Sequence, residues 1–83
     1  MVFVYVLRDE TGKRYVGITN NIDRRIAEHR AKHSKAGQLL TEFQLVLREA
    51  HPDYTSARKR EKFLKSGQGR AWLDSRLNRS EPA

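Results

Sequence analysis

The sequence predicts a small α+β domain, in which a three-stranded antiparallel or mixed sheet is flanked by three helices. Three observations lead to this fold class. Two β-branched and aromatic runs, residues 2–8 and 13–19, are separated by a glycine-containing turn. A pair of asparagines introduces an amphipathic segment, and a third strand-like run with alternating apolar residues follows at 42–49. Two helical segments near the C-terminus complete the order β-β-α-β-α-α.

The first two strands form a predicted hairpin. Gly12 suits the left-handed position at the end of a three-residue loop over residues 10–12. In the register that this loop imposes, Tyr5 lies opposite Gly17. Tyr5 and Tyr15 then share one face of the sheet as diagonal neighbours, because side chains alternate between faces along a strand. Gly17 leaves a gap beside them.

The first predicted helix covers residues 22–32 and follows two good N-caps, Asn20 and Asn21. At 100° per residue, one arc of roughly 100° holds a set of five residues: Ile22, Arg25, Ile26, His29 and His33. The two isoleucines mark the inward face. Arg25 and His29 are therefore expected within that face or at its edge.

The second predicted helix covers about residues 57–65, after a cap at Thr55 or Ser56. Its inward arc again contains charged residues: Ala57, Arg60, Glu61 and Leu64. A glycine-rich interruption at residues 67–69 precedes the last predicted helix, 70–77, anchored by Trp72, Leu73 and Leu77. We expect residues 1–77 to form one domain and residues 78–83, which lack an apolar anchor, to be a frayed tail.

The composition favours a polyanionic partner. The 83 residues carry a formal net charge of +7, with a sequence pI near 10.3, which points first to nucleic acid and second to an anionic membrane. The absence of cysteine excludes disulfides and thiolate metal sites. The apolar N-terminal run is too short to span a bilayer and lacks a basic n-region. We therefore expect a cytoplasmic protein without a membrane partner.

Five polar residues occupy positions where local rules favour apolar side chains: Tyr5, Tyr15, Arg25, His29 and Glu61. Together they could line one concave surface between sheet and helices. Arg25 can hold a phosphate oxygen with its fork of donors, and Glu61 is a hard oxygen ligand suited to Mg²⁺. A tyrosine or His29 could take a proton from water. Taken singly, each residue also fits a structural role, such as an ion pair between Glu61 and Arg25 or Arg60.

The spacing of these residues resembles the GIY-YIG nuclease family. Val4-Tyr5 and Tyr15-Val16-Gly17 stand where the family has its two name-giving motifs, and Arg25 follows Tyr15 by ten residues. His29 comes one helical turn later, and Glu61 lies in the segment RKREKFLK. The resemblance covers residues 2 to about 73 and is nearest to small single-domain bacterial members. Its departures, such as Phe3 in place of glycine, are apolar replacements within strands.

The resemblance implies the GIY-YIG type of fold and a divalent-metal-dependent endonuclease. Such an enzyme uses Mg²⁺ or Mn²⁺ and hydrolyses phosphodiester bonds. We expect the substrate to be structured or single-stranded DNA of repair or recombination, with DNA favoured over RNA and the choice between them left open by the sequence. The tyrosines and His29 would activate water and contact phosphate, Arg25 would bind the scissile phosphate, and Glu61 would hold the metal. Four further cations are candidate nucleic-acid contacts: Lys13, Arg24, Arg58 and Lys65.

Two other functions fit the same sequence. A nucleic-acid-binding module could keep the fold without cleavage, because phosphate contacts alone give salt-dependent binding. A partner subunit could use Phe63 and the helix of Trp72 as its interface, although so short a chain is expected to bury its single tryptophan. The oligomeric state is left open by the sequence.

Overall fold

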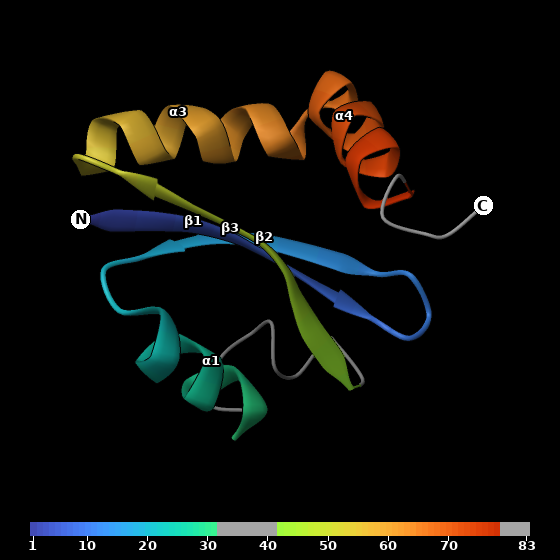
Figure 1. Ribbon diagram of the computed structural model, residues 1–83, viewed down its shortest axis with the longest axis horizontal. Coiled ribbons are helices and arrows are strands. Elements are labelled where there is room, and N and C mark those ends of the chain that lie inside the picture. Colours follow the sequence, from blue (N-terminus) through green and yellow to red (C-terminus); the bar gives the residue numbers. More distant parts are fainter. Residues whose placement is uncertain (32–41, 79–83) are drawn as a thin grey trace.

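The computed structural model describes residues 1–31 and 42–78. Its elements follow in the predicted order and are shown in Figure 1: β1 (Val2–Asp9), β2 (Arg14–Thr19), α1 (Ile22–Arg30), β3 (Phe43–His51), α3 (Tyr54–Lys65) and α4 (Gly67–Asn78). The three strands form one sheet in the order β2-β1-β3, and both pairings are antiparallel. The predicted α+β class is confirmed.

The β1–β2 hairpin has the predicted register. Tyr5 pairs with Gly17, and the amide of Asp9 donates to the carbonyl of Lys13 at 2.9 Å. Gly12 has a φ of 92°, which is the left-handed conformation that the turn needs and that glycine adopts without strain. This hairpin fixes where the two motif tyrosines stand on the sheet.

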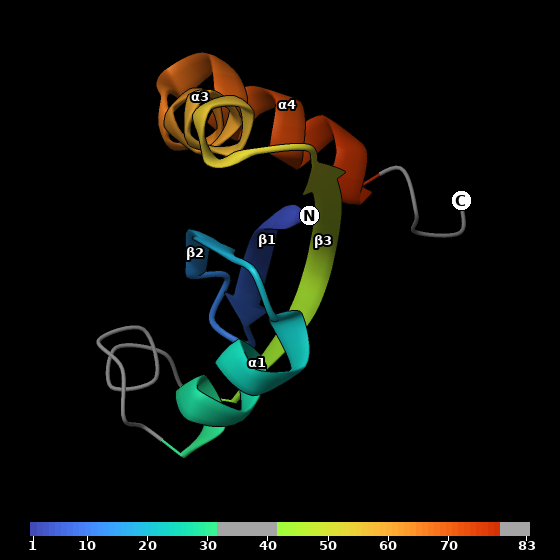
Figure 2. The ribbon, with the colours of Figure 1, turned by 90° about the vertical axis from the view of Figure 1, so that its left-hand side faces the viewer.

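The sheet separates two apolar layers. On one face, Val2, Val4 and Val6 pack with Ala57 and Leu64 of α3 and with Leu73 of α4. On the other face, Tyr5 and Leu7 pack with Ile22 and Phe43. Figure 2 shows the consequence for the helices, since α3 and α4 lie on one side of the sheet and α1 on the other.

Trp72 is half-buried and packs against the layer beneath α3 and α4. The guanidinium carbons of Arg60 and Arg76 lie 4.4 and 5.4 Å from its ring centroid. The tryptophan thus contributes to the core of the chain, as its burial in a short sequence leads one to expect.

Two helix boundaries differ from the sequence prediction. The N-cap of α3 is Asp53, whose carboxylate accepts from the amide of Ser56 at 2.8 Å, so the prediction of Thr55 or Ser56 as cap is wrong. The reason is that aspartate is among the strongest N-caps and starts the helix three residues earlier. The helix α1 ends at Arg30, and the predicted inward residue His33 lies outside the described residues.

The predicted glycine interruption before the last helix is wrong. The break falls at Ser66, which has extended backbone angles, and residues 67–69 form the first turn of α4. Gly69 is buried, and a Cβ there would overlap the carbonyl oxygen of Phe63. Glycine is present because the two helices approach closely, not because the chain must bend. Asn78 closes α4, and residues 79–83 of the predicted tail lie outside the described residues.

Within residues 1–31 and 42–78, no helix is both long and apolar enough to cross a membrane.

Candidate active site

Tyr5 lies at the centre of the sheet and has no exposed surface. Its ring extends from β1 across the neighbouring strand β2, where it lies over Gly17. A Cβ on Gly17 would come within 2.5 Å of the Tyr5 hydroxyl oxygen and 3.0 Å of Cε2 of Tyr15. The glycine of the second motif therefore makes the space that lets the phenol of the first motif reach across β2.

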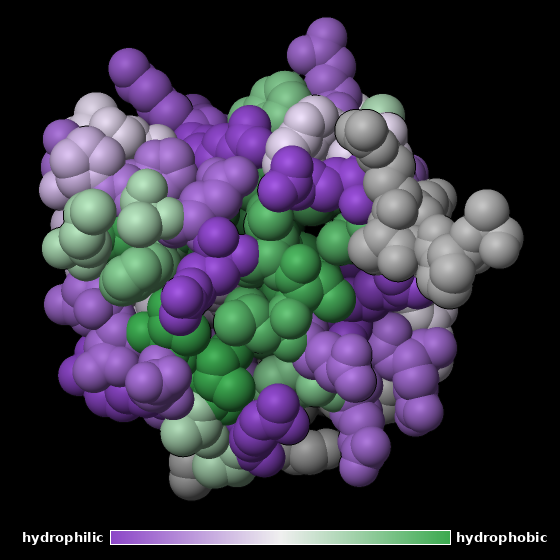
Figure 3. Space-filling view, viewed as in Figure 1, coloured by the Kyte–Doolittle hydropathy of each residue, from purple (hydrophilic) through white to green (hydrophobic). Residues whose placement is uncertain are grey.

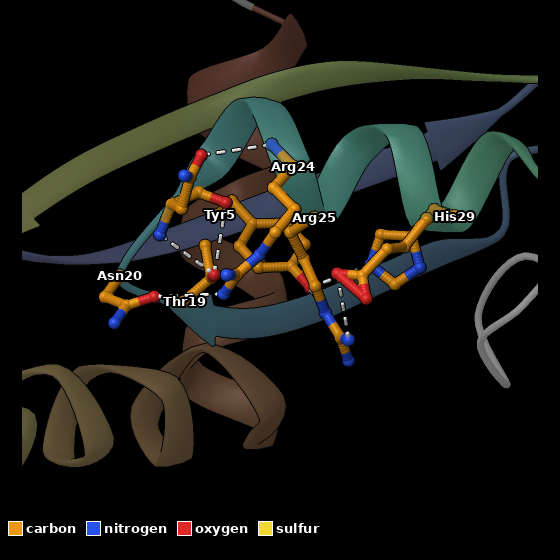
Figure 4. A network of polar contacts seen from close by, with 8 residues as sticks. Tyr5, Thr19, Asn20, Arg24, Arg25 and His29 are labelled. Atoms are coloured by element: carbon orange, nitrogen blue, oxygen red, sulfur yellow. Dashed lines mark hydrogen bonds and ion pairs between the residues drawn. The ribbon is translucent and has the colours of Figure 1, made fainter.

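The helix α1 is aligned over Tyr5 by the joint that precedes it. The side chain of Asn21 caps the helix by accepting from the amide of Arg24 at 3.1 Å, and Thr19 exchanges hydrogen bonds with the backbone of Asn21. Arg25 and His29 are one turn apart, so both project from α1 toward Tyr5 (Figure 4). The capped start of the helix thus fixes the position of both side chains.

The hydroxyl of Tyr5 joins Arg25 to His29. Arg25 Nε lies 3.4 Å from the hydroxyl oxygen, and His29 Nε2 lies 2.8 Å from it. A guanidinium can only donate, so the hydroxyl accepts from Arg25. Its own proton is buried and needs an acceptor, and we assign it to Nε2 of His29, 2.8 Å away. Nε2 of His29 is then the acceptor, and the neutral ring carries its proton on Nδ1.

The ionisation of this pair follows from its burial. Burial lowers the pKa of His29, and the positive charge of Arg25 lowers it further. Burial also raises the pKa of Tyr5, against the effect of the hydrogen bond from Arg25. Both groups are therefore neutral at pH 7, consistent with the hydrogen-bond directions. Neither is exposed to solvent, so neither can contact a substrate in this conformation.

Tyr15 and Arg25 are the members of this cluster that reach the surface. Tyr15 is half-buried, and its ring centroid lies 6.2 Å from that of Tyr5 and 5.5 Å from that of His29. The side chain of Arg25 is 35% exposed and lies 3.9 Å from a carboxylate oxygen of Glu28. Sequence reasoning missed Glu28, although its spacing of three residues from Arg25 on the helix is the signal that could have found it.

Glu61 lies on the other side of the sheet, in the helix α3, and is directed toward the edge strand β2. It and Arg60 border the buried stripe of Ala57 and Leu64 on opposite flanks of α3. Arg60 is bound to Glu49 of β3 through two hydrogen bonds of 2.9 and 3.0 Å. Because the strand order is β2-β1-β3 and α3 also packs on β2, Glu61 lies on the β2 flank.

The carboxylate of Glu61 is near the cluster but not part of its hydrogen bonds. Burial is the largest cause that raises the pKa of Tyr5, and Tyr15 and the charge of Glu61 act in the same direction, whereas the contacts with Arg25 lower this pKa. The side chain of Glu61 is 18% exposed, and Lys65 Nζ lies 3.3 Å from Oε2. The expectation of one concave surface between sheet and helices thus needs revision. Four of the five residues lie together where α1 packs on the sheet. Glu61 approaches the β2 edge from the opposite face.

A comparison with known proteins gives the family. The family described as GIY-YIG catalytic domain matches residues 1–74, nearly all of the described chain. The chain belongs to the GIY-YIG family. The match spans the three strands, α1, α3, the first part of α4 and all five candidate residues.

Relatives of this GIY-YIG chain carry the name UPF0213. It is 42% identical over 64 residues to a UPF0213 protein of Autographa californica nuclear polyhedrosis virus, covering 75% of this chain and 62% of that protein. It is 42% identical over 65 residues to one of Desulfotalea psychrophila, covering 76% and 59%. The chain therefore spans about three fifths of the length of these relatives.

The fold also matches a solved structure. The solution NMR structure of a UPF0213 protein from Bacillus halodurans superposes with a TM-score of 0.56 and 33% sequence identity. The match covers 90% of this chain and 84% of that chain. The α+β architecture is thus shared with an experimentally determined relative.

Glu61 offers a hard divalent cation a single carboxylate ligand. Among the described residues, no group of three or more histidine, aspartate or glutamate side chains could hold a metal together. A single carboxylate suffices for Mg²⁺, which keeps several waters and completes its shell with phosphate oxygens. Such a site would require Lys65 to move off Oε2. The absence of cysteine leaves oxygen donors as the chemistry of this edge.

The four predicted nucleic-acid contacts are all exposed. Lys13 follows the β1–β2 turn, and Arg24 stands beside Arg25 on α1 with a 3.4 Å hydrogen bond to Asn20. Arg58 and Lys65 lie on α3, three residues before and four residues after Glu61. Arg24, Arg58 and Lys65 therefore stand next to a candidate catalytic residue, one turn or less away along the same helix.

Proposed function

We propose that this protein is a divalent-metal-dependent endonuclease that hydrolyses phosphodiester bonds in DNA, in structured or single-stranded substrates such as arise in repair and recombination. The observation that carries the proposal is the chain of contacts from Arg25 through the Tyr5 hydroxyl to His29. It holds a partly exposed guanidinium in place beside a partly exposed tyrosine. Membership of the GIY-YIG family supports the same chemistry.

Arg25 is the residue that binds the scissile phosphate. Its planar fork can donate two parallel hydrogen bonds to phosphate oxygens, and charge-assisted bonds of this kind are strong. The Nε position is already held by Tyr5, which leaves the terminal nitrogens, one of them near Glu28, facing outward. As negative charge develops on the phosphate in the transition state, a guanidinium that is already oriented stabilises it.

Tyr15 is the group that would receive a proton from the attacking water, and it must act as a phenolate to do so. It lies next to Tyr5 and His29 but retains solvent contact, whereas those two residues are buried. The water oxygen attacks phosphorus as its proton passes to the Tyr15 phenolate, and the bond between phosphorus and the leaving oxygen breaks. The leaving oxygen departs with the bonding electron pair and takes a proton from solvent. Tyr5 and His29 act behind this step as positioning residues, because they touch Arg25 and Tyr15 rather than the substrate.

Glu61 would hold the metal ion. A bound Mg²⁺ or Mn²⁺ would polarise the phosphate and stabilise the leaving oxygen. Before an ion binds, Lys65 neutralises the Glu61 carboxylate. A divalent cation in place of that ammonium would leave the edge with excess positive charge, which the substrate phosphate would offset.

A panel of labelled DNAs tests the proposal: single-stranded, duplex, flap and four-way junction, each with Mg²⁺, with Mn²⁺ and with chelator. We expect metal-dependent cuts that fall at least about 100-fold in Glu61→Ala. Glu10→Ala is the matched control, because Glu10 is an exposed carboxylate in the hairpin turn. An RNA strand of the same sequence separates DNA from RNA as substrate.

The second candidate function is a nucleic-acid-binding module without cleavage. The observation that favours it is the Lys65–Glu61 ion pair, which already occupies the candidate metal ligand. In the same panel, this function predicts retention of DNA on the protein with no cuts in any metal, and equal binding by Glu61→Ala and Glu10→Ala.

A further inference from the structure

The outer face of α3 carries an exposed aromatic residue in line with three cations. Tyr54, Arg58, Lys62 and Lys65 follow one another at spacings of four, four and three residues, which places them on one side of the helix. All four are exposed, and Tyr54 is 50% exposed. We call these four residues the α3 ridge.

Tyr54 differs from the other aromatic residues that the structure describes. Six of them are buried or half-buried: Phe3, Tyr5, Tyr15, Phe43, Phe63 and Trp72. Single exposed apolar residues are common on protein surfaces, so exposure alone decides nothing. The distinguishing feature is that the ring of Tyr54 shares its helix face with a row of cations.

The α3 ridge runs alongside the proposed metal ligand. Glu61 lies at its border, joined to Lys65 by the 3.3 Å ion pair and three residues from Arg58. In Figure 3, hydrophilic residues gather along the upper border of the molecule, where Figure 1 places α3, while apolar residues gather over the sheet. A polyanion lying on the ridge would therefore pass beside Glu61.

The length of the ridge suits a short stretch of one strand. From Tyr54 to Lys65 the helix rises about 16 Å at 1.5 Å per residue. That distance spans about five nucleotides at the 3.4 Å spacing of one stacked strand. Cations that follow a strand, together with an aromatic ring that receives a base, are the two components of single-strand binding surfaces.

We propose that the α3 ridge binds a single-stranded segment of the substrate, with an unpaired base stacked on Tyr54 and phosphates on Arg58, Lys62 and Lys65. This inference rests on the proposed nucleic-acid function and adds the substrate class. A base inside a duplex already stacks on both of its faces, so the Tyr54 ring can receive a base only where the strand is unpaired. The preferred substrate is then single-stranded or carries a flap.

The test is the binding of a labelled 12-nucleotide single strand in chelator, measured by fluorescence anisotropy. A base on an aromatic ring contributes about 1–3 kcal/mol, so we expect Tyr54→Ala to weaken binding by about fivefold to 100-fold. Tyr54→Phe, which keeps the ring, should bind like the unchanged protein. An abasic strand with the same phosphates should bind equally to the unchanged protein and to Tyr54→Ala.

Charge variants on the same helix provide the second arm. Lys62→Met should weaken binding of both the normal and the abasic strand. It should also reduce the slope of log K against log salt concentration by about 0.7, the value for one phosphate contact with a single strand. Lys59→Met is the matched control, because Lys59 is an exposed lysine on α3 that lies about 140° around the helix from Tyr54 and about 160° from Glu61. It should weaken binding less than Lys62→Met does.

The inference is overturned if Tyr54→Ala binds the normal single strand as tightly as the unchanged protein, or loses the abasic strand equally. Equal affinity for duplex and single strand would also overturn it. Chelator prevents metal-dependent cleavage, so the result does not depend on catalysis. If the protein makes metal-dependent cuts but Tyr54→Ala does not change single-strand binding, the proposed nuclease function still holds and only the role of the α3 ridge is rejected.

Discussion

Arg25 depends for its orientation on a phenol that no substrate touches. The hydroxyl of Tyr5 accepts from Nε of Arg25 and donates to His29, and both Tyr5 and His29 are neutral and buried. Sequence spacing found these residues together with Tyr15, because period-two and period-3.6 patterns place side chains on faces. It did not reveal that two of them are fully buried, since burial depends on how closely α1 packs on the sheet.

Tyr5→Phe tests the positioning role. The change keeps the ring in the core and removes the hydroxyl, which takes away the anchor of Arg25 and the hydrogen bond between the hydroxyl and Nε2 of His29. Losing one partner of a buried hydrogen bond costs about 1–3 kcal/mol of stability. We expect the single-turnover cleavage rate to fall at least tenfold, with DNA affinity in chelator within about twofold of the unchanged protein. An unchanged cleavage rate would show that the hydroxyl does not position Arg25.

The lowered pKa of His29 predicts acid sensitivity. In the unfolded chain His29 has a pKa of about 6.5 and binds a proton below that pH. In the folded chain the same histidine stays neutral until the pH falls to its own, lower pKa. The free energy of unfolding therefore falls as pH falls from about 6.5, by at most about 1.4 kcal/mol per pH unit for one proton. Urea unfolding at pH 7.5, 6.5 and 5.5 measures this dependence.

His29→Gln is the control for that dependence, because glutamine does not titrate, and it should flatten the curve over this range. Glu49 acts elsewhere: burial works to raise its pKa, but hydrogen bonds from Arg60 and His51 outweigh burial and lower it. Its contribution is lost only as pH falls below about 4.5, outside the measured range. An equally steep curve in His29→Gln would assign the acid sensitivity to another group.

At the scale of elements, the sequence predicted all six segments but misplaced two helix starts. The strand hairpin was predictable to the residue, since Gly12 fixes the turn and the turn fixes the register of Tyr5 with Gly17. The starts of α3 and α4 were not. Asp53 acts as a cap through a side-chain hydrogen bond, and Gly69 is required by a contact with another helix. The periodic spacing of apolar residues predicts neither the cap at Asp53 nor the helix contact at Gly69.

A pair of glycine substitutions tests the account of α4. Gly69→Ala places a Cβ against the carbonyl of Phe63 and the Cα of Leu64. Overpacking of this kind costs about 1–3 kcal/mol of stability. Gly67→Ala is the matched control, because a Cβ there meets nothing within 4 Å, and it should leave stability unchanged or raise it by up to about 1 kcal/mol. Chemical denaturation of both variants measures their free energies of unfolding. Equal stabilities would contradict a close approach at Gly69.

At the scale of the whole molecule, the sheet places two helices with complementary chemistry on opposite faces. Arg25 of α1 and Glu61 of α3 both approach the edge strand β2, one from each face. The sequence showed which residues carry the chemistry but not this arrangement, because helix faces read from periodicity do not say which side of the sheet a helix covers. The edge of β2 is where phosphate and metal would meet.

The measurement that tests this account most directly is a double-mutant cycle on the cleavage rate. Arg25→Lys, Glu61→Asp and the double variant are compared with the unchanged protein under single-turnover conditions with Mg²⁺. Conservative changes are chosen so that residual cleavage stays measurable. If both side chains act on one phosphate, each single change should slow cleavage at least tenfold, and the double variant should be clearly faster than the product of the two effects requires. Purely multiplicative effects, or cleavage at the unchanged rate in either single variant, would contradict a common site at β2.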